Sequence, residues 1–153
     1  MKELKEYGFK PSYLNAKTDA DVTENIKSLS DEDAKLYTIT KIEASGYKKT
    51  AKVYIASDSD MQSIQMEQDL TDKLDPGHAW LAVRDYGKDQ YPSGFDLNYM
   101  AGKIAQEASD ENTWYLKATC DVTDENGVKT KMTCESHITG TTDNPEVIDF
   151  TVY

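Results

Sequence analysis

The stretch that decides the fold lies in the last third of the chain, residues 114–138, WYLKATCDVTDENGVKTKMTCESHI. In both halves of this stretch the apolar side chains fall mainly on even-numbered positions and the polar ones on odd-numbered positions. Such alternation is typical of strands with one buried face. The segment Asp124-Glu-Asn-Gly127 separates the halves and suits a short hairpin loop with Gly127 in the left-handed conformation. The stretch therefore predicts a β-hairpin.

The apolar pattern also predicts the register of this hairpin. Two even-numbered apolar sets share one face only if the numbers of paired residues add to an even value, which requires a loop of odd length. A three-residue loop brings Asp121 across from Lys131 and Lys117 across from Glu135. Opposite charges directly across a strand pair are stabilising. The charges thus agree with the register that the apolar pattern predicts.

Four further segments have the composition of strands. Residues 147–153 alternate and predict a third antiparallel strand with Ile148, Phe150 and Val152 turned inward. Residues 37–44 and 50–56 predict a second hairpin around Ser45-Gly46. The nearly continuous apolar run from His78 to Arg84 predicts a central strand buried on both faces.

Helices are expected in three segments. Apolar spacing predicts a helix over 19–36, capped by Asp19 or Asp21 and restarted at Ser30, whose Ser-x-x-Asp pattern is typical of a cap. Good helix formers extend from 58 to 74, where Asp75-Pro76-Gly77 ends them. A third helix is expected over 97–108, following a capping pattern at Ser93 and Asp96.

These elements predict an α+β fold with a mainly antiparallel sheet, a C-terminal hairpin or meander over 114–153 and two to four helices. The chain has 153 residues and contains neither an internal repeat nor a long Gly, Pro or Ser linker. Its length is that of one ordinary domain, large enough to bury a core without metal or disulfide. We therefore expect a single domain over residues 1–153.

Composition excludes several classes of function. The net charge is -11, from 17 Lys and Arg against 28 Asp and Glu, which disfavours direct nucleic-acid binding because nucleic-acid-binding proteins carry a basic footprint. No stretch approaches the ~20 apolar residues of a bilayer helix, so no membrane insertion is expected. Met1 to Phe9 is charged and no apolar segment follows, so no signal peptide is expected. A cytoplasmic protein is the first expectation, and an extracellular one follows if the chain is a mature fragment.

The two cysteines are expected to be core residues. Cys120 and Cys134 share the apolar face in the predicted register, close enough for a disulfide in an oxidising compartment. Cys134-x-x-His137 together with Cys120 suggests zinc, but His137 points to the opposite face, beside Tyr115. We expect no metal and no cofactor.

His78 is the residue best placed by the sequence for catalysis, since it lies between a Pro-Gly turn and the expected central strand. The stretch Gly77-His-Ala-Trp-Leu-Ala-Val83, followed by Gly94-Phe95, resembles the histidine-bearing strand of circularly permuted papain-like proteins of the NlpC/P60 type. The resemblance covers about twenty residues. It implies a cysteine hydrolase in which His78 is the base, or a degenerate relative of one, but the family's cysteine begins a helix and no cysteine here does.

Acidic side chains are the other candidate functional feature. Residues 58–75 contain one lysine and six carboxylates, and a second cluster occupies 31–33. The six are Asp58, Asp60, Glu67, Asp69, Asp72 and Asp75. A surface of this charge attracts a basic protein and accelerates the encounter.

Three functions are therefore open. The first is an acidic protein-binding module, acting as a stoichiometric inhibitor or immunity-type protein on a basic partner through the carboxylates of residues 58–75. The second is a permuted papain-like hydrolase, or its degenerate relative, that uses His78. The third is an accessory domain of an extracellular or surface protein. We expect the first, and a binding protein rather than an enzyme; the oligomeric state and the identity of the partner are left open.

Overall fold

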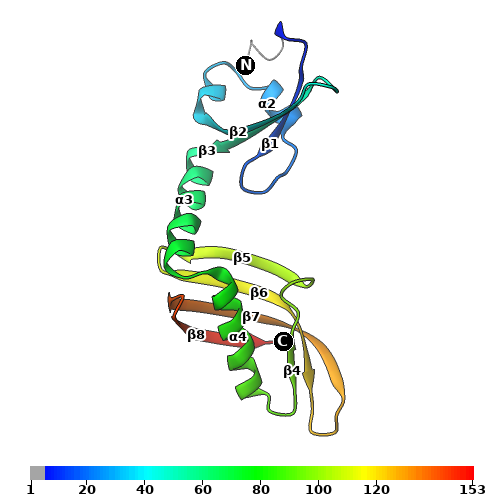
Figure 1. Ribbon diagram of the computed structural model, residues 1–153, viewed down its shortest axis with the longest axis vertical. Coiled ribbons are helices and arrows are strands. Elements are labelled where there is room, and N and C mark those ends of the chain that lie inside the picture. The colour runs from blue at the N-terminus through cyan, green and yellow to red at the C-terminus, as the bar shows by residue number, and fades with distance from the viewer. Residues whose placement is uncertain (1–5) are drawn as a thin grey trace. The chain divides into compact units, whose positions relative to one another are not determined.

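The structure is a computed structural model that describes residues 6–153, and it forms two compact units, Met1–Ile64 and Gln65–Tyr153 (Figure 1). Each unit has its own sheet and its own cluster of buried residues. The predicted α+β fold with a mainly antiparallel sheet is confirmed. The single domain over residues 1–153 stays a prediction. No signal peptide was expected at Met1 to Phe9, and residues 1–5 of that segment lie outside the described residues.

The Met1–Ile64 unit is built on a three-stranded sheet in the order β1-β3-β2. β1 (Lys10–Asn15) pairs in parallel with β3 (Thr50–Ser57), and β2 (Tyr37–Ser45) pairs antiparallel with β3, which confirms the predicted hairpin. The core consists of Tyr13, Val53 and Ile55, against which the short helix α2 (Thr23–Lys27) packs. β2 forms one edge of this sheet.

The helix expected over 19–36 is wrong in its extent. Only α2 and the 3-10 turn η1 (Asp33–Leu36) are helical there. Asn15 and Asp19 form a turn before α2, in which the Asn15 side chain accepts backbone N–H groups and Asp19 has a φ of +56°. Side chains that bond to nearby backbone compete with a helix in this way. A new turn, η1, does follow Ser30, whose Oγ accepts the Asp33 N–H at 3.1 Å, but the residue that precedes η1 is Glu32 and it makes no side-chain cap.

The Gln65–Tyr153 unit contains a five-stranded antiparallel sheet. β6 (Thr113–Thr123), β7 (Lys129–Thr141) and β8 (Asn144–Val152) follow one another as a meander, as predicted. β4 (Phe95–Leu97) and β5 (Lys103–Asp110) lie one after the other along the free edge of β6.

The register of the β6–β7 hairpin is the predicted one. Asp121 pairs with Lys131 and Lys117 with Glu135, and Gly127 has the expected positive φ of +79°. Cys120 and Cys134 both lie in the core. Apolar alternation and cross-strand charges together were sufficient to determine this pairing.

The inward face of β8 differs from the prediction at one residue. A β-bulge between His137 and Ile138 shifts the pairing, so that Val147 packs on the core and Ile148 is exposed. Phe150 and Val152 do face inward, as predicted. A bulge places two residues of one strand opposite one of its partner, which interrupts strict alternation.

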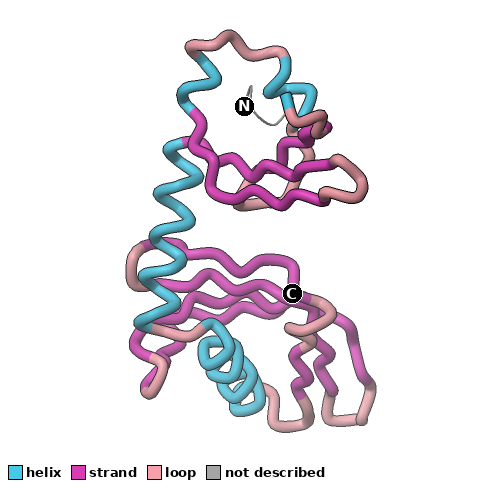
Figure 2. The backbone as a smooth tube through the Cα atoms, turned by 45° about the horizontal axis from the view of Figure 1, so that its top comes forward, coloured by secondary structure: helices cyan, strands magenta, loops and turns pink. Residues whose placement is uncertain are grey.

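The expected central strand at His78 to Arg84 is wrong, because these residues belong to α4 (Pro76–Gln90). Asp75 caps this helix by accepting the His78 N–H, and Pro76 occupies its first turn, where proline is favoured. The buried residues Ala79, Val83 and Gly87 recur every four positions and pack α4 against one face of the sheet (Figures 1 and 2). α4 follows the expected helix of residues 58–74, observed as α3 (Asp58–Lys73).

The helix expected over 97–108 is also wrong, since the chain forms β4 and β5 there. Met100 and Ile104, which belonged to its supposed apolar stripe, are exposed. A side chain at Gly102 would meet Thr119 Oγ1 at 2.0 Å, so this segment contains a close backbone approach. Pairing with the free edge of β6 therefore overrides local helical spacing. None of α2, α3 and α4, the helices of the described residues, is long and apolar enough to cross a membrane.

Candidate functional site

The six carboxylates predicted to bind a partner are divided between the two units. Asp58 and Asp60 begin α3 in Met1–Ile64, and the other four lie in Gln65–Tyr153. Asp69 and Asp72 are exposed and lie about one turn apart, although Asp69 accepts a hydrogen bond from Gln65 at 2.7 Å. Asp58 is exposed and Glu67 is half-buried. The sequence cluster is therefore not a single continuous set of available carboxylates.

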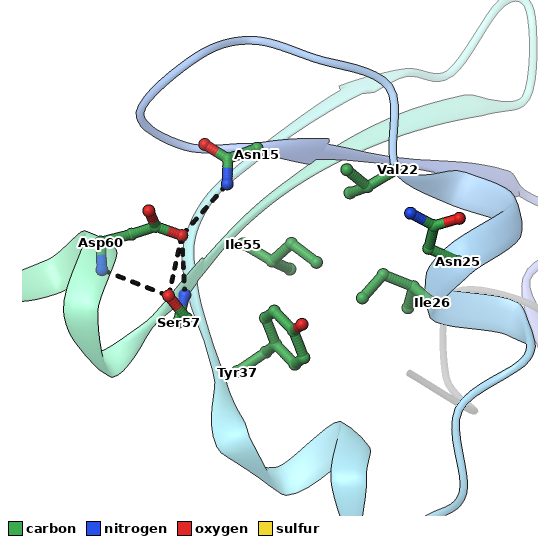
Figure 3. A pocket seen from close by; sticks show the side chains of 8 residues that line it. All are labelled: Asn15, Val22, Asn25, Ile26, Tyr37, Ile55, Ser57 and Asp60. Carbon is green, nitrogen blue, oxygen red and sulfur yellow. Dashed lines mark hydrogen bonds between the residues drawn. The ribbon is translucent and has the colours of Figure 1, made fainter.

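Asp60 has a structural role at the start of α3 (Figure 3). Its Oδ2 accepts hydrogen bonds from Ser57 Oγ at 2.9 Å and from Asn15 Nδ2 at 3.1 Å, while Ser57 Oγ accepts the Asp60 N–H at 3.2 Å. The Ser57 N–H also donates to Asp60 Oδ2, at 3.3 Å, and this reciprocal pair of bonds is a capping box with Ser57 as the cap. The hydrogen bond from Ser57 is the main reason why the pKa of Asp60 lies below its usual value.

A small pocket of about 140 Å³ opens beside this cap (Figure 3). Polar and apolar side chains line it in equal measure, among them Asn25, Ile26, Tyr37 and Ile55. Its one carboxylate, Asp60, is already occupied by the cap. The pocket accordingly has no free charged group that would select a ligand.

Asp75 and His78 form a pair at the start of α4. The Asp75 carboxylate accepts the His78 backbone N–H at 3.1 Å and lies 3.0 Å from the His78 Nδ1. These bonds lower the pKa of Asp75. His78 is exposed, with 55% of its side chain accessible, so its position follows from helix capping.

The cysteines do not offer a nucleophile. Both are free thiols within the core, so the disulfide considered from the sequence does not form here. Burial raises the pKa of Cys120 to about 11 and that of Cys134 to about 12, which leaves both protonated at neutral pH. A protonated, buried thiol is inert, so no observation favours the hydrolase that the resemblance implies. The resemblance itself stays a prediction, although its histidine lies on a helix and not on a strand.

The zinc arrangement considered from the sequence does not assemble. Cys134 is buried, whereas His137 lies beside the Tyr115 ring and its Nδ1 is 2.9 Å from Asp149. Within residues 6–153, no group of three or more His, Cys, Asp or Glu side chains could hold a metal ion.

A shallow, open groove of about 580 Å³ lies in the Gln65–Tyr153 unit, between α4 and the start of β8. This surface, hereafter the α4–β8 groove, contains three carboxylates together with apolar side chains. Its lining consists of Ala82, Asp85, Tyr86, Asp89, Pro145, Glu146 and Val147. The Tyr86 ring is held by Phe150 at a centroid distance of 5.3 Å and remains 39% exposed.

Two of the three groove carboxylates are available for a partner. Asp85 is already paired with the Arg84 guanidinium at 2.8 Å. Asp89 is exposed, and Glu146 is exposed and accepts one bond from Asn144 Nδ2 at 3.2 Å. The groove therefore presents negative charge beside a fixed aromatic ring, an arrangement that suits a lysine or arginine side chain.

The polar face of the sheet contains a second charged cluster, centred on Glu135. Its carboxylate accepts hydrogen bonds from Lys117, from Tyr115 at 3.0 Å and from Tyr153 at 2.5 Å. Lys117 is the main cause of the lowered pKa of Glu135, about 2. All three donors bind this one carboxylate, and the charge of Lys117 offsets that of Glu135. The cluster therefore links β6, β7 and the end of the chain after β8.

Sequence analysis missed the groove residues because they come from two distant segments. Asp85 and Asp89 lie together on α4, whereas the expected strand ended at Arg84 and included neither of them. The signal that could have found them is the Asp75-Pro76 helix start combined with four-residue spacing. Glu146 is placed beside them by the pairing of β7 with β8.

Comparison of this chain with protein-family models, with curated proteins and with solved structures finds no match.

Proposed function

We propose that this protein is a binding module for a basic protein partner, which it engages through the α4–β8 groove. The groove is the observation that supports the proposal most directly, because it combines exposed carboxylates with an exposed tyrosine that packs on Phe150. Tyrosine rings held in place are common anchors of protein interfaces, since they lose little conformational freedom on binding.

The distribution of charge supports the same surface. Gln65–Tyr153 carries 17 acidic and 7 basic side chains, whereas Met1–Ile64 carries 11 acidic and 10 basic ones. Nearly all of the net charge of -11 therefore belongs to the unit that contains the groove. Such a field attracts a basic partner over the Debye length, about 10 Å at 0.1 M salt.

Binding would proceed by steering followed by docking. The field of the unit, to which the exposed Asp69 and Asp72 contribute, orients the basic surface of the partner. A lysine or arginine stem then packs on Tyr86 and its charged end reaches Asp89 and Glu146. A stoichiometric inhibitor or immunity-type protein covers a basic surface in this manner, and this is the role we assign to the module.

The test is an NMR titration of the full chain with an oligolysine peptide at low and at high salt. We expect shifts that concentrate on Tyr86, Asp89 and Glu146 and that weaken at high salt. Asp89→Asn and Glu146→Gln should each weaken binding by about two- to fivefold, the usual effect of removing one exposed charge pair.

A matched control separates the groove from general charge. Glu125→Gln removes the same charge in the exposed β6–β7 loop, outside the groove, and should leave the affinity nearly unchanged. Equal losses in all three variants would show that net charge alone attracts the peptide, and the groove would lose its role. Losses confined to Asp69→Asn and Asp72→Asn would transfer the site to α3.

A further inference from the structure

We propose that the protein forms a symmetric dimer in which the β2 strands of two copies pair antiparallel, with Ile42 at the twofold axis. β2 lies at the edge of its sheet, and all nine of its residues, Tyr37–Ser45, are exposed. The backbone groups on its outer side have no neighbouring strand within the Met1–Ile64 unit as described. An exposed strand of this length is a template for pairing with another chain.

The apolar face of β2 continues the core of its own sheet. Ile42 pairs with Val53 and Ile39 pairs with Ile55, so both isoleucines share the face on which α2 packs. α2 has only five residues, and Ile39 and Ile42 remain 45% and 48% exposed. A strand added beside β2 would cover these side chains and extend one apolar face across both copies.

The charges of β2 are complementary to themselves in one register. With Ile42 across from Ile42 of the second copy, Lys41 lies across from Glu43 of the second copy, and the reverse pair forms by symmetry. Shifting the axis to Lys41 or Glu43 places like charges opposite each other. In a register where the numbers of paired residues add to an odd value, the apolar face of one β2 strand lies beside the polar face of the other. The register centred on Ile42 is therefore selected on both grounds.

The three central pairs of this register, from Lys41 to Glu43, are not interrupted by the bulge in β2. The bulge lies between Ile39 and Lys41, and the pairing with β3 is continuous from Lys41↔Tyr54 to Ser45↔Thr50. Lys41 and Glu43 already form an ion pair at 2.5 Å within one copy. In the dimer the two pairs would form a four-membered ring of alternating charge.

The ends of β2 are complementary as well. The acidic residues Asp31, Glu32 and Asp33 precede the strand, and Lys48 and Lys49 follow it in the turn to β3. Antiparallel pairing brings the start of one strand beside the end of the other, so each acidic segment approaches the lysine turn of the second copy. The nearly balanced charge of Met1–Ile64 makes this the unit in which self-association meets the least repulsion.

The experiment measures the oligomeric state of the full chain by sedimentation equilibrium over a wide range of concentration. The wild-type chain should form a dimer, and Lys41→Glu and Glu43→Lys should each weaken it by at least about tenfold, because each replaces two attractive pairs with two repulsive ones. An equal mixture of the two variants should form a heterodimer, since one strand then carries only carboxylates and the other only ammonium groups.

Circular dichroism shows that each variant is folded before it is used. A wild-type chain that stays monomeric at every concentration would overturn the proposal. So would a dimer that both single variants retain, because its interface would then lie elsewhere. Failure of the mixed variants to associate would equally refute the Ile42-centred register.

Discussion

Replacing Gly87 with alanine should destabilise the Gln65–Tyr153 unit, although alanine is the better helix former. Gly87 lies buried in α4, where the chain passes against the Phe95 ring of β4. A Cβ at this position would lie 2.2 Å from Phe95 Cε1, 2.4 Å from Cδ1 and 2.7 Å from Cζ. The ring cannot retreat freely, because Tyr91 and Phe150 pack against it at centroid distances of 5.9 and 5.7 Å.

The magnitude follows from two opposing effects. Alanine favours a helix interior over glycine by about 1 kcal/mol. Overpacking of a closed core costs about 1–3 kcal/mol, and three contacts far below van der Waals distance place Gly87→Ala near the upper end of that range. We therefore expect a net loss of about 2 kcal/mol in the free energy of unfolding.

Urea denaturation followed by tryptophan fluorescence measures this loss directly. Trp80 and Trp114 are both buried in the core of this unit, so the signal reports on the unit that contains Gly87. Lys88→Ala, at the exposed neighbouring position of α4, is the matched control and should change stability by less than about 0.5 kcal/mol.

A double-mutant cycle isolates the contact. Phe95→Val removes all three clashing atoms, so in that background Gly87→Ala should become neutral or stabilising, with a coupling energy of about 2–3 kcal/mol. If Gly87→Ala is stabilising while Phe95 is present, or if it has the same effect in both backgrounds, the close packing of α4 on β4 is not the reason for glycine at this position.

Two further predictions concern ionisation in the sheet. Hydrogen bonds from Lys117 and the tyrosines lower the pKa of Glu135 to about 2, whereas the ordinary value is about 4.3. The ionised carboxylate therefore stabilises the fold fully above pH ~4.3. This contribution is lost as the pH falls toward 2. The urea midpoint of the wild type should therefore be higher than that of Glu135→Gln at neutral pH, and the two midpoints should be equal near pH 2. A difference between the midpoints that does not change with pH would contradict this. Cys120 and Cys134 should be unreactive toward Ellman's reagent in the native protein and give two thiols in urea, whereas fewer than two in urea would indicate a disulfide.

The strands of the C-terminal meander were predictable because their pattern is local and redundant. Alternation in β6 and β7, the Gly127 turn and the charge pairs at Lys117 and Asp121 all indicate the same register. The α3 boundaries were equally clear, since helix formers end at a proline. Agreement among independent local signals is what makes a sequence specify one structure.

The segments between those regions were decided by tertiary contacts. A run such as His78 to Arg84 fits a buried strand or a buried helix equally well, and packing on the sheet selected the helix. Residues 97–108 had helical spacing, but the free edge of β6 required strands to satisfy its backbone groups. The candidate site shows the same division, since the acidic character was evident from the sequence while the α4–β8 groove was not.

The sequence alone determined the fold class, the β6–β7 register, the core position of both cysteines and the excess of negative charge, because each depends on the spacing of residues along one or two neighbouring elements. Only the tertiary structure decided that α4 is a helix, that Asp60 belongs to the capping box of α3 while Asp75 caps α4, and that Asp89 and Glu146 line one groove with Tyr86. These features depend on which elements meet in space, and a one-dimensional pattern does not contain that information.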